Sequence, residues 1–179
     1  NDLANRSTVV PVLGLSSQAT AISSNRYHTA ILLNNGTVRV CGRNNYAQLG
    51  QVDIVTRSTL VQVVMPLAFT PACYVNTYNS VSRLSNFLGY NTALVTPDGK
   101  VLVCGRNDNG QLGQNDLFTR STVVNIIGIS SQAIAVSCGG YHTAVVLNDG
   151  TVRTCGRNEF GQLGLNDLVT RSTLVTVTL

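Results

Sequence analysis

Short apolar runs alternate with clusters of Gly, Asn and Asp along the chain, and the last third shows this pattern most clearly. Gly139-Gly140 marks a tight turn between two such runs, and Asp149-Gly150 is a strong signal for a hairpin with a two-residue turn. No segment has the helical period of about 3.6 residues over the length of a long helix. Four segments have the length, composition and flanks of antiparallel strands: Ala133–Cys138, Tyr141–Leu147, Thr151–Cys155 and Ser172–Val177.

The same unit recurs along the chain. The tripeptide Arg-Ser-Thr begins at positions separated by 51, 63 and 51 residues, namely Arg6, Arg57, Arg120 and Arg171. The dipeptide Cys-Gly recurs with separations of 63 and 51 residues, at Cys41, Cys104 and Cys155. A four-stranded unit that repeats about every fifty residues is typical of a propeller blade. We therefore predict an all-β fold of three four-stranded antiparallel β-propeller blades, either as an incomplete ring or as part of a larger or oligomeric propeller.

The repeats divide the chain into three tandem units and a tail. The units are residues 1–51, 52–114 and 115–165, and the tail, residues 166–179, matches residues 1–14 at eight positions. We predict that the tail begins a fourth repeat or is a strand donated to a neighbouring copy. Since propellers close with about four to eight blades, three blades leave two end faces, which further blades of the same polypeptide or neighbouring copies must cover.

Three motifs of the third repeat carry a family resemblance. They are Gly-Tyr-His-Thr-Ala at 140–144, Asp-Gly-Thr-Val at 149–152 and Cys-Gly-Arg-Asn-Glu-Phe-Gly-Gln-Leu-Gly at 155–164. Related sequences stand at 89–93 and 104–113 in the second repeat and at 26–30 and 41–50 in the first. These motifs resemble the repeat of the regulator of chromosome condensation family. The resemblance implies a β-propeller, usually of seven blades.

This sequence departs from the family pattern at several positions. Cysteine stands where an aromatic residue is common before the Gly of the last motif, Arg26 and Ala47 replace glycines in the first repeat, and Asn91 replaces His in the second. The resemblance also implies guanine-nucleotide exchange on a small GTPase, the founding activity of the family. We rank this activity below the other hypotheses, because no partner-contact motif of the family can be matched to these repeats.

The composition favours an extracellular or cell-surface protein. Apolar residues make up 44% of the chain and charged residues only 11%, and Asn, Ser and Thr are abundant. Asn5-Arg6-Ser7 and Asn35-Gly36-Thr37 fit the N-glycosylation pattern, so Asn5 and Asn35 are candidate glycan sites. No apolar stretch approaches the ~20 residues of a membrane-spanning helix.

The net charge of +4 does not indicate a nucleic-acid surface. The arginines stand at fixed repeat positions, each close to an Asp or Asn of its own repeat. There is no run of Lys and Arg and no basic patch interleaved with aromatic residues. We therefore predict that the chain does not bind nucleic acid.

The two histidines, His28 and His142, fall at equivalent repeat positions, which the spacing of the blades keeps apart. We expect them to make structural hydrogen bonds, a role that Asn91 fills with its amide in the second repeat. No nucleophile, base and acid can be assembled, so we predict no catalytic residue, no metal site and no cofactor. Glycines at one repeat position are expected to permit positive φ or close contact between blades: Gly42, Gly105 and Gly156.

The five cysteines allow two interpretations. With two-residue turns at both hairpins of the third repeat, strand alternation places Cys138 and Cys155 on opposite faces of one blade. Because adjacent blades pack opposite faces together, Cys104 could then form a disulfide with Cys138, and Cys41 with Cys73. Cys155 would remain unpaired. The alternative is that all five are buried thiols.

An insertion of twelve residues distinguishes the second repeat and lies within residues 65–82. Two prolines together with Phe69, Tyr74 and Tyr78 make it a loop rich in contact-forming side chains. Such a loop on a rigid scaffold is typical of a partner-binding site, and a flap packed on its own surface is the alternative.

These observations predict a non-enzymatic β-propeller repeat module that acts as a scaffold for protein–protein interaction. Its partner is expected to be another protein or copies of itself. The alternative is a self-assembling structural subunit of an extracellular oligomer or filament.

Overall fold

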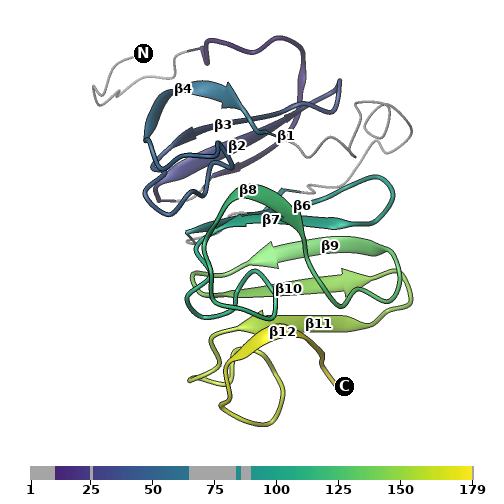
Figure 1. The fold of residues 1–179 in the computed structure, drawn as a ribbon. Coiled ribbons are helices and arrows are strands. Elements are labelled where there is room, and N and C mark those ends of the chain that lie inside the picture. Colours follow the sequence, from purple (N-terminus) through teal and green to yellow (C-terminus); the bar gives the residue numbers. More distant parts are fainter. Residues whose placement is uncertain (1–10, 25, 65–83, 86–89, 179) are drawn as a thin grey trace.

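The described part of the chain consists of strands and loops. A computed structural model describes residues 11–24, 26–64, 84–85 and 90–178. Twelve strands in these residues form three four-stranded antiparallel sheets. The sheets are stacked in chain order, from the one nearest the N-terminus to the one nearest the C-terminus (Figure 1). The predicted all-β fold with four-stranded blades is confirmed.

Each sheet contains four strands that are consecutive in the chain, and each strand pairs with its sequence neighbour. Blade one contains β1 (Ala19–Ser24), β2 (His28–Leu33), β3 (Val38–Gly42) and β4 (Arg57–Gln62). Blade two contains β5 (Leu84–Ser85), β6 (Asn91–Val95), β7 (Val101–Gly105) and β8 (Arg120–Asn125). Blade three contains β9 (Ala133–Cys138), β10 (His142–Leu147), β11 (Val152–Gly156) and β12 (Arg171–Thr176).

The tail completes blade three. β12 pairs with β11 in the third sheet, with Arg171 opposite Gly156. Within the tail, Arg171–Thr176 thus forms the fourth strand of blade three. The sequence repeat and the structural blade are out of phase, because the Arg-Ser-Thr motifs at Arg57, Arg120 and Arg171 begin the fourth strands of blades one, two and three.

The hairpin between the second and third strands has a loop of three residues, one more than the Asp-Gly pattern predicts. In blade three, Leu147 N donates to Thr151 O at 2.9 Å, which leaves Asn148, Asp149 and Gly150 in the loop. Gly150 has a φ of 83°, the left-handed conformation that the last residue of such a loop adopts. A shift of one residue in register exchanges the two faces of a strand.

The faces assigned to two cysteines from the sequence are therefore wrong. The first hairpin also closes differently from a two-residue turn, because Gly139 N donates to His142 O at 2.8 Å. As a result, Cys138 and Cys155 both lie opposite Thr143 and share one face of blade three.

The hydrophobic core lies between the blades. One cluster joins blades one and two and includes Ala30, Val40, Leu49, Leu94, Leu102 and Cys104. The other joins blades two and three and includes Val103, Leu112, Val145, Leu147, Cys155 and Leu174. Each blade thus buries its apolar side chains against its neighbour, and the middle blade uses both of its faces.

The loop after the third strand of each blade is closed by a buried Asn. In blade two, Asn107 Nδ2 donates to Asp116 O at 2.9 Å and to Asp116 Oδ1 at 3.0 Å, and Asn107 Oδ1 accepts from Leu112 N at 2.8 Å. Asp116 forms an ion pair with Arg120, the first residue of β8. Asn44 and Asn158 make the same bonds in the other blades.

Polar contacts between blades one and two meet at one backbone carbonyl. Thr92 Oγ1 donates to Gln48 O at 2.8 Å, and Cys104 Sγ lies 3.7 Å from the same oxygen. His28 Nε2 lies 2.9 Å from Thr92 Oγ1. Because the hydroxyl proton of Thr92 is directed at Gln48, Nε2 of His28 carries the proton of this second bond.

The interface between blades two and three repeats this scheme. Thr143 Oγ1 donates to Gln111 O at 2.7 Å, and Cys155 Sγ lies 3.6 Å from Gln111 O. Asn91 Nδ2 donates to Thr143 Oγ1 at 3.4 Å, so an amide takes the place of the imidazole.

A backbone hydrogen bond also recurs at both interfaces. Val52 N donates to Ser121 O at 2.8 Å, and Asn115 N donates to Ser172 O at 2.9 Å. Each bond joins the loop after the third strand of one blade to the fourth strand of the next.

Replacing His28 with Asn should remove part of the acid sensitivity of the fold. Burial lowers the pKa of His28 from 6.5 to about 4, so His28 stays neutral in the folded state while the unfolded chain binds a proton. The free energy of unfolding therefore falls as the pH drops from about 6.5 to about 4, by on the order of 3 kcal/mol from this group. Urea unfolding at pH 7 and pH 4.5 should show a smaller loss for His28→Asn than for the unchanged protein.

The half-buried His142 provides the control. Burial lowers its pKa as well, with less of the ring enclosed, so His142→Asn should change the pH profile less. Parallel profiles for His28→Asn and the unchanged protein would contradict a neutral, buried His28.

Asn107→Ala should destabilise the protein by about 1–3 kcal/mol, because it removes the buried partner of Leu112 N and of the Asp116 carbonyl. Asn109→Ala is the matched control, since the Asn109 side chain only meets Asp108 at the surface, and its effect should stay within about 0.5 kcal/mol. Equal unfolding midpoints for the two variants would show that the buried amide does not hold the loop.

Candidate functional site

The residues singled out from the sequence lie in separate places. Four of them, all in the insertion, are outside the described residues: Phe69, Cys73, Tyr74 and Tyr78. Their roles stay predictions. His28 and His142 lie in blades one and three. Across the described ranges, no group of three His, Cys, Asp or Glu side chains could hold a metal ion.

In each blade, a glycine at the end of the third strand lets the start of the second strand approach closely. These glycines occupy one repeat position: Gly42, Gly105 and Gly156. Their φ angles are 111°, 106° and 109°. A Cβ at Gly105 would lie 2.4 Å from Tyr90 O and 2.7 Å from Asn91 Cα, an approach that only glycine permits. The next residue, Arg106, donates its backbone N–H to Tyr90 O at 2.8 Å. Tyr90 and Arg106 therefore leave the sheet side by side.

The same arrangement in all three blades builds a continuous surface feature, here called the Tyr–Arg strip: Tyr27, Arg43, Tyr90, Arg106, Tyr141 and Arg157. The rings of Tyr27 and Tyr90 stack with centroids 5.7 Å apart, and the centroids of Tyr90 and Tyr141 are 6.4 Å apart. The Arg43 guanidinium carbon lies 5.0 Å from the Tyr27 centroid and 5.9 Å from that of Tyr90. Arg106 lies 5.2 Å from the centroids of both Tyr90 and Tyr141. Such distances are those of cation–π contacts.

Two further aromatic residues extend the strip. The Tyr46 centroid lies 4.9 Å from that of Tyr90, and Arg106 lies 4.8 Å from the Tyr46 ring. At the other end, Arg157 lies 5.4 Å from the ring of Phe160, whose residue is 81% exposed. The six residues of the strip itself are half-buried, so their rotamers are restrained while one side of each remains accessible.

The positive charge of the strip is compensated unevenly. Two of its arginines pair with a carboxylate two residues further on: Arg106 with Asp108, and Arg157 with Glu159. Asn45 stands at the equivalent position after Arg43, and Arg43 forms no ion pair within the described part of the chain. The exposed Arg26 lies 5.3 Å from the Tyr27 ring, so the blade-one end carries the excess of positive charge.

The strip is suited to binding. Burial, together with the neighbouring Tyr27, raises the pKa of Tyr90, so its hydroxyl is neutral near pH 7. The strip thus offers hydroxyls, ring faces and guanidinium N–H donors, which complement carboxylates and carbonyl oxygens. Tyrosine and arginine are also among the residues enriched in binding hot spots.

Sequence reasoning misses this strip because its members are far apart along the chain. The signal in the sequence is the position of these residues within each repeat: a Tyr precedes the second strand of each blade, and an Arg follows the third strand of each blade. Because those two strands are antiparallel, the start of one and the end of the other lie at the same end of the blade.

The four cysteines that the structure describes are thiols: Cys41, Cys104, Cys138 and Cys155. The structure therefore does not contain the Cys104–Cys138 disulfide considered from the sequence. Burial, with a contribution from the nearby Cys138, raises the pKa of both Cys104 and Cys155. Cys41 is half-buried, and burial raises its pKa as well.

Asn35, one of the two candidate glycan sites, is exposed in the β2–β3 hairpin, and its Oδ1 accepts from Thr37 N at 3.0 Å. A glycan at Asn35 stays a prediction, and Asn5 lies outside the described residues. Among the residues that the structure describes, no helix has the length and apolar character that crossing a membrane requires.

The chain is similar to proteins that carry one type of repeat. Models described as Regulator of chromosome condensation (RCC1) repeat match residues 19–48 and 133–162, and residues 98–146. The X-linked retinitis pigmentosa GTPase regulator of Mus musculus is 37% identical over an aligned length of 193 residues. The alignment covers 78% of this chain and 18% of that protein. The chain spans less than a fifth of the length of the first curated relatives that it matches.

Two solved structures share the fold. The crystal structure of human WBSCR16 has a TM-score of 0.79 at 20% identity, covering 96% of this chain and 40% of that one. Yeast RCC1 (Prp20), in a crystal structure with Kap60, has a TM-score of 0.73 at 15% identity, covering 90% of this chain and 37% of that one. At these identities the likeness shows the β-propeller fold alone.

Iodoacetamide should alkylate Cys41 in the native protein well before Cys104, Cys138 and Cys155. The last three are at most 1% exposed, whereas Cys41 is half-buried. Peptide mapping after timed labelling measures the order, and labelling in urea gives the fully reactive reference. A Cys104–Cys138 cross-link in the non-reducing map would contradict the structure.

Proposed function

The chain belongs to the regulator of chromosome condensation (RCC1) repeat family, and on that premise we propose that it is a non-enzymatic β-propeller module that binds a protein partner through the Tyr–Arg strip. The observation that carries this proposal is the alternation of stacked tyrosine rings and arginines across all three blades. Neighbouring blades hold these side chains in place, so binding loses little side-chain entropy.

The charge of the strip indicates the chemistry of the partner. Among the residues that the structure describes, no carboxylate forms an ion pair with Arg43 or Arg26, in contrast to Arg106 and Arg157, so the blade-one end favours an acidic segment. The exposed ring of Phe160 at the other end favours an apolar contact. We therefore infer a partner segment with carboxylates near blade one and an apolar side chain near blade three.

The comparisons support binding to a protein and leave the partner open. The mouse relative is named as a GTPase regulator, and the yeast structure contains Kap60 bound to RCC1. Guanine-nucleotide exchange on a small GTPase is a less favoured proposal for this chain, supported by the family and that relative's name. Partner contacts by Phe69, Tyr74 and Tyr78, and a location outside the cell or on its surface, also stay proposals.

Selection of random linear peptides on the immobilised chain tests this function. The enriched peptides should be rich in Asp and Glu. Tyr90→Ala should weaken binding of a selected peptide about 30-fold, as expected for a hot spot worth about 2 kcal/mol, and Arg43→Gln about 10-fold. Fluorescence anisotropy with the labelled peptide measures both changes.

Lys100→Gln is the charge-matched control. It removes one positive charge at the β6–β7 hairpin, at the opposite end of the strands from the strip, where Lys100 pairs with Asp98. Peptide affinity should remain within about twofold. If Lys100→Gln and Arg43→Gln weaken binding equally, the interaction is a general effect of net charge and the strip is not the site.

A further inference from the structure

The long loop after the third strand of each blade carries a pair of apolar residues directly after its Asp. These pairs, here called the loop tips, are Ile54–Val55, Leu117–Phe118 and Leu168–Val169. In blades one and two each of these residues is more than half exposed, and Phe118 is 73% exposed. Blade two lies between the other two blades (Figure 1), and its tip is still exposed. The exposure therefore belongs to the loop itself and not to the place of a blade in the stack.

The backbone at the loop tips is hydrogen-bonded within the loop. Phe118 N donates to Asp116 Oδ1 at 3.0 Å, and Phe118 O accepts from Arg120 Nη1 at 2.7 Å. Equivalent bonds hold Val55 and Val169 in the other two loops. The second residue of each tip thus presents its apolar side chain without an unpaired backbone group. Contact with an apolar medium requires this, because such a medium supplies no hydrogen bonds.

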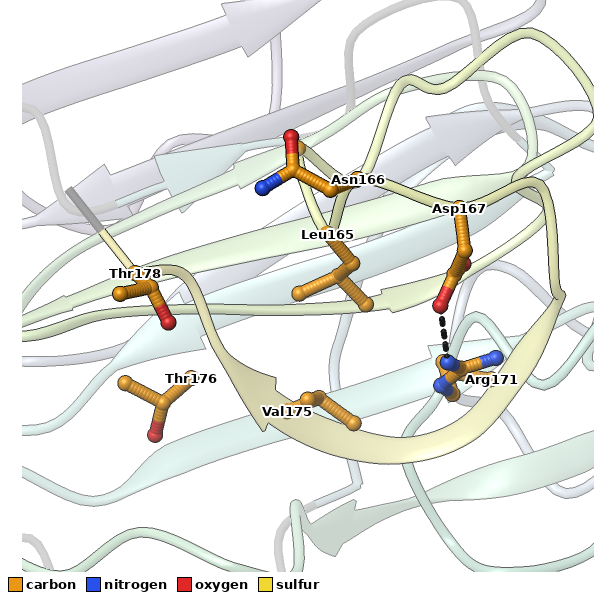
Figure 2. Close-up of a pocket in the computed structure, with 8 residues that line it drawn as sticks. Leu165, Asn166, Asp167, Arg171, Val175, Thr176 and Thr178 are labelled. Carbon is orange, nitrogen blue, oxygen red and sulfur yellow. Dashed lines mark hydrogen bonds and ion pairs between the residues drawn. The ribbon is translucent and has the colours of Figure 1, made fainter.

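Charged groups at the long-loop end of the blades are mostly paired. Each carboxylate that the structure describes at this end forms an ion pair with an arginine: Asp53–Arg57, Asp108–Arg106, Asp116–Arg120, Glu159–Arg157 and Asp167–Arg171. Figure 2 shows the last of these pairs beside β12. Arg26 and Arg43 are at the same end of the blades and form no ion pair with a described carboxylate. This end is therefore apolar at the loop tips and positive in net charge.

Val52, two residues before the blade-one tip, has a backbone conformation that β-branched residues rarely adopt. Its φ is 69°, in the left-handed region, where asparagine is tolerated and valine is strained. Asn115 and Asn166 hold this position in the other blades, with φ of 58° and 57°. Val52 is 60% exposed, so burial of its side chain does not offset the strain. Such strain is typical of functional sites, and here it adds a third exposed apolar side chain beside the tip.

We propose that the loop tips insert into the interfacial region of a membrane that contains anionic lipids. The long loops lie on one side of the stack and the hairpins between second and third strands on the other (Figure 1), so one surface can meet the tips of successive blades. The tips are short projections, separated by polar residues and whole strands. A fluid bilayer surrounds separate projections, whereas a protein would need a matching pocket for each of them.

The charge of this end favours the anionic lipid. Arg26 and Arg43 attract anionic headgroups, and the paired carboxylates do not repel them as free ones would. Insertion of apolar side chains and attraction of basic ones together give the interfacial binding of peripheral proteins. The loop tips are not part of the Tyr–Arg strip, so the proposal does not depend on the proposed function.

A single tryptophan at a loop tip tests the insertion directly. The chain contains no tryptophan, so Phe118→Trp introduces one fluorescent reporter. Vesicles of equimolar phosphatidylcholine and phosphatidylserine should shift its emission to shorter wavelength, and brominated lipid should quench it, because the indole leaves water for the acyl boundary.

Ile127→Trp is the matched control. Ile127 is 52% exposed and follows β8 at the hairpin end of the blades, where the preceding Ile126 N donates to Val101 O. Its emission should not change when the same vesicles are added.

Vesicle flotation measures the contribution of each side chain. Ile54→Ser and Phe118→Ser should each weaken binding about tenfold, since each removes a large apolar side chain from contact with lipid. Ile127→Ser should leave it within about twofold. Val52→Asn should raise Tm by about 2–4 °C, because it relieves the strain, and should weaken vesicle binding several-fold. A merely structural Val52 would not combine a gain in stability with a loss of binding.

The outcomes separate a membrane from the other surfaces that could cover the loop tips. A shift for Phe118→Trp alone, weaker binding by the tip variants and preference for vesicles with phosphatidylserine support the proposal. Absence of vesicle binding, equal shifts for the two tryptophan variants, or equal binding by Ile54→Ser and Ile127→Ser would each overturn it. Equal binding to vesicles of phosphatidylcholine alone would overturn it as well.

Two results would assign the loop tips to a protein contact and thereby overturn the proposal. One is a loss of the peptide selected on the Tyr–Arg strip in Phe118→Ser, without any vesicle binding by the unchanged chain. The other is self-association of the unchanged chain in light scattering that Ile54→Ser abolishes, again without vesicle binding. Failure of the peptide selection alone would count against the proposed function and leave the vesicle result intact.

Discussion

The blades of this protein are joined, at both interfaces, through a backbone carbonyl within the long loop that follows the third strand of the earlier blade. Gln48 and Gln111 are fully buried, and their carbonyl oxygens receive hydrogen bonds only across the interface, from a Thr hydroxyl and a Cys thiol among the described residues. A buried carbonyl without a donor is costly, so each blade needs the next one at a defined position. Apolar contacts alone would tolerate sliding between sheets. The polar contact fixes the stack to one register, and the apolar clusters then pack around it.

Interface and surface are built from adjacent residues. Tyr27 and His28 are neighbours in the chain, yet Tyr27 stacks in the Tyr–Arg strip while His28 bonds to the next blade. Successive side chains of a strand point to opposite sides, so one short motif serves both purposes. The glycine of each Cys-Gly-Arg motif also contributes to the Tyr–Arg strip, because it brings the second and third strands of the blade close enough to place the Tyr beside the Arg.

Most of the fold follows from the sequence, and most of the site does not. The four strands of blade three are predicted within one or two residues, because apolar runs and turn residues delimit them sharply. The faces of Cys138 and Cys155 are predicted wrongly, because Asp149-Gly150 is compatible with loops of two or three residues and only the backbone decides between them. The Tyr–Arg strip is missed because its cation–π contacts join residues of different blades, and no local sequence pattern gives the distance between neighbouring blades. The insertion with Phe69 lies outside the described residues.

The phase difference between sequence repeat and blade has a consequence for how such a protein can change in length. A duplicated stretch of 51 residues that starts at an Arg-Ser-Thr brings a fourth strand followed by three others. Its first strand completes the sheet before it, and its remaining strands start a sheet that the next Arg-Ser-Thr completes. A tandem duplication of this gene segment therefore adds one whole sheet and leaves no strand without a partner, wherever along the array the recombination occurs.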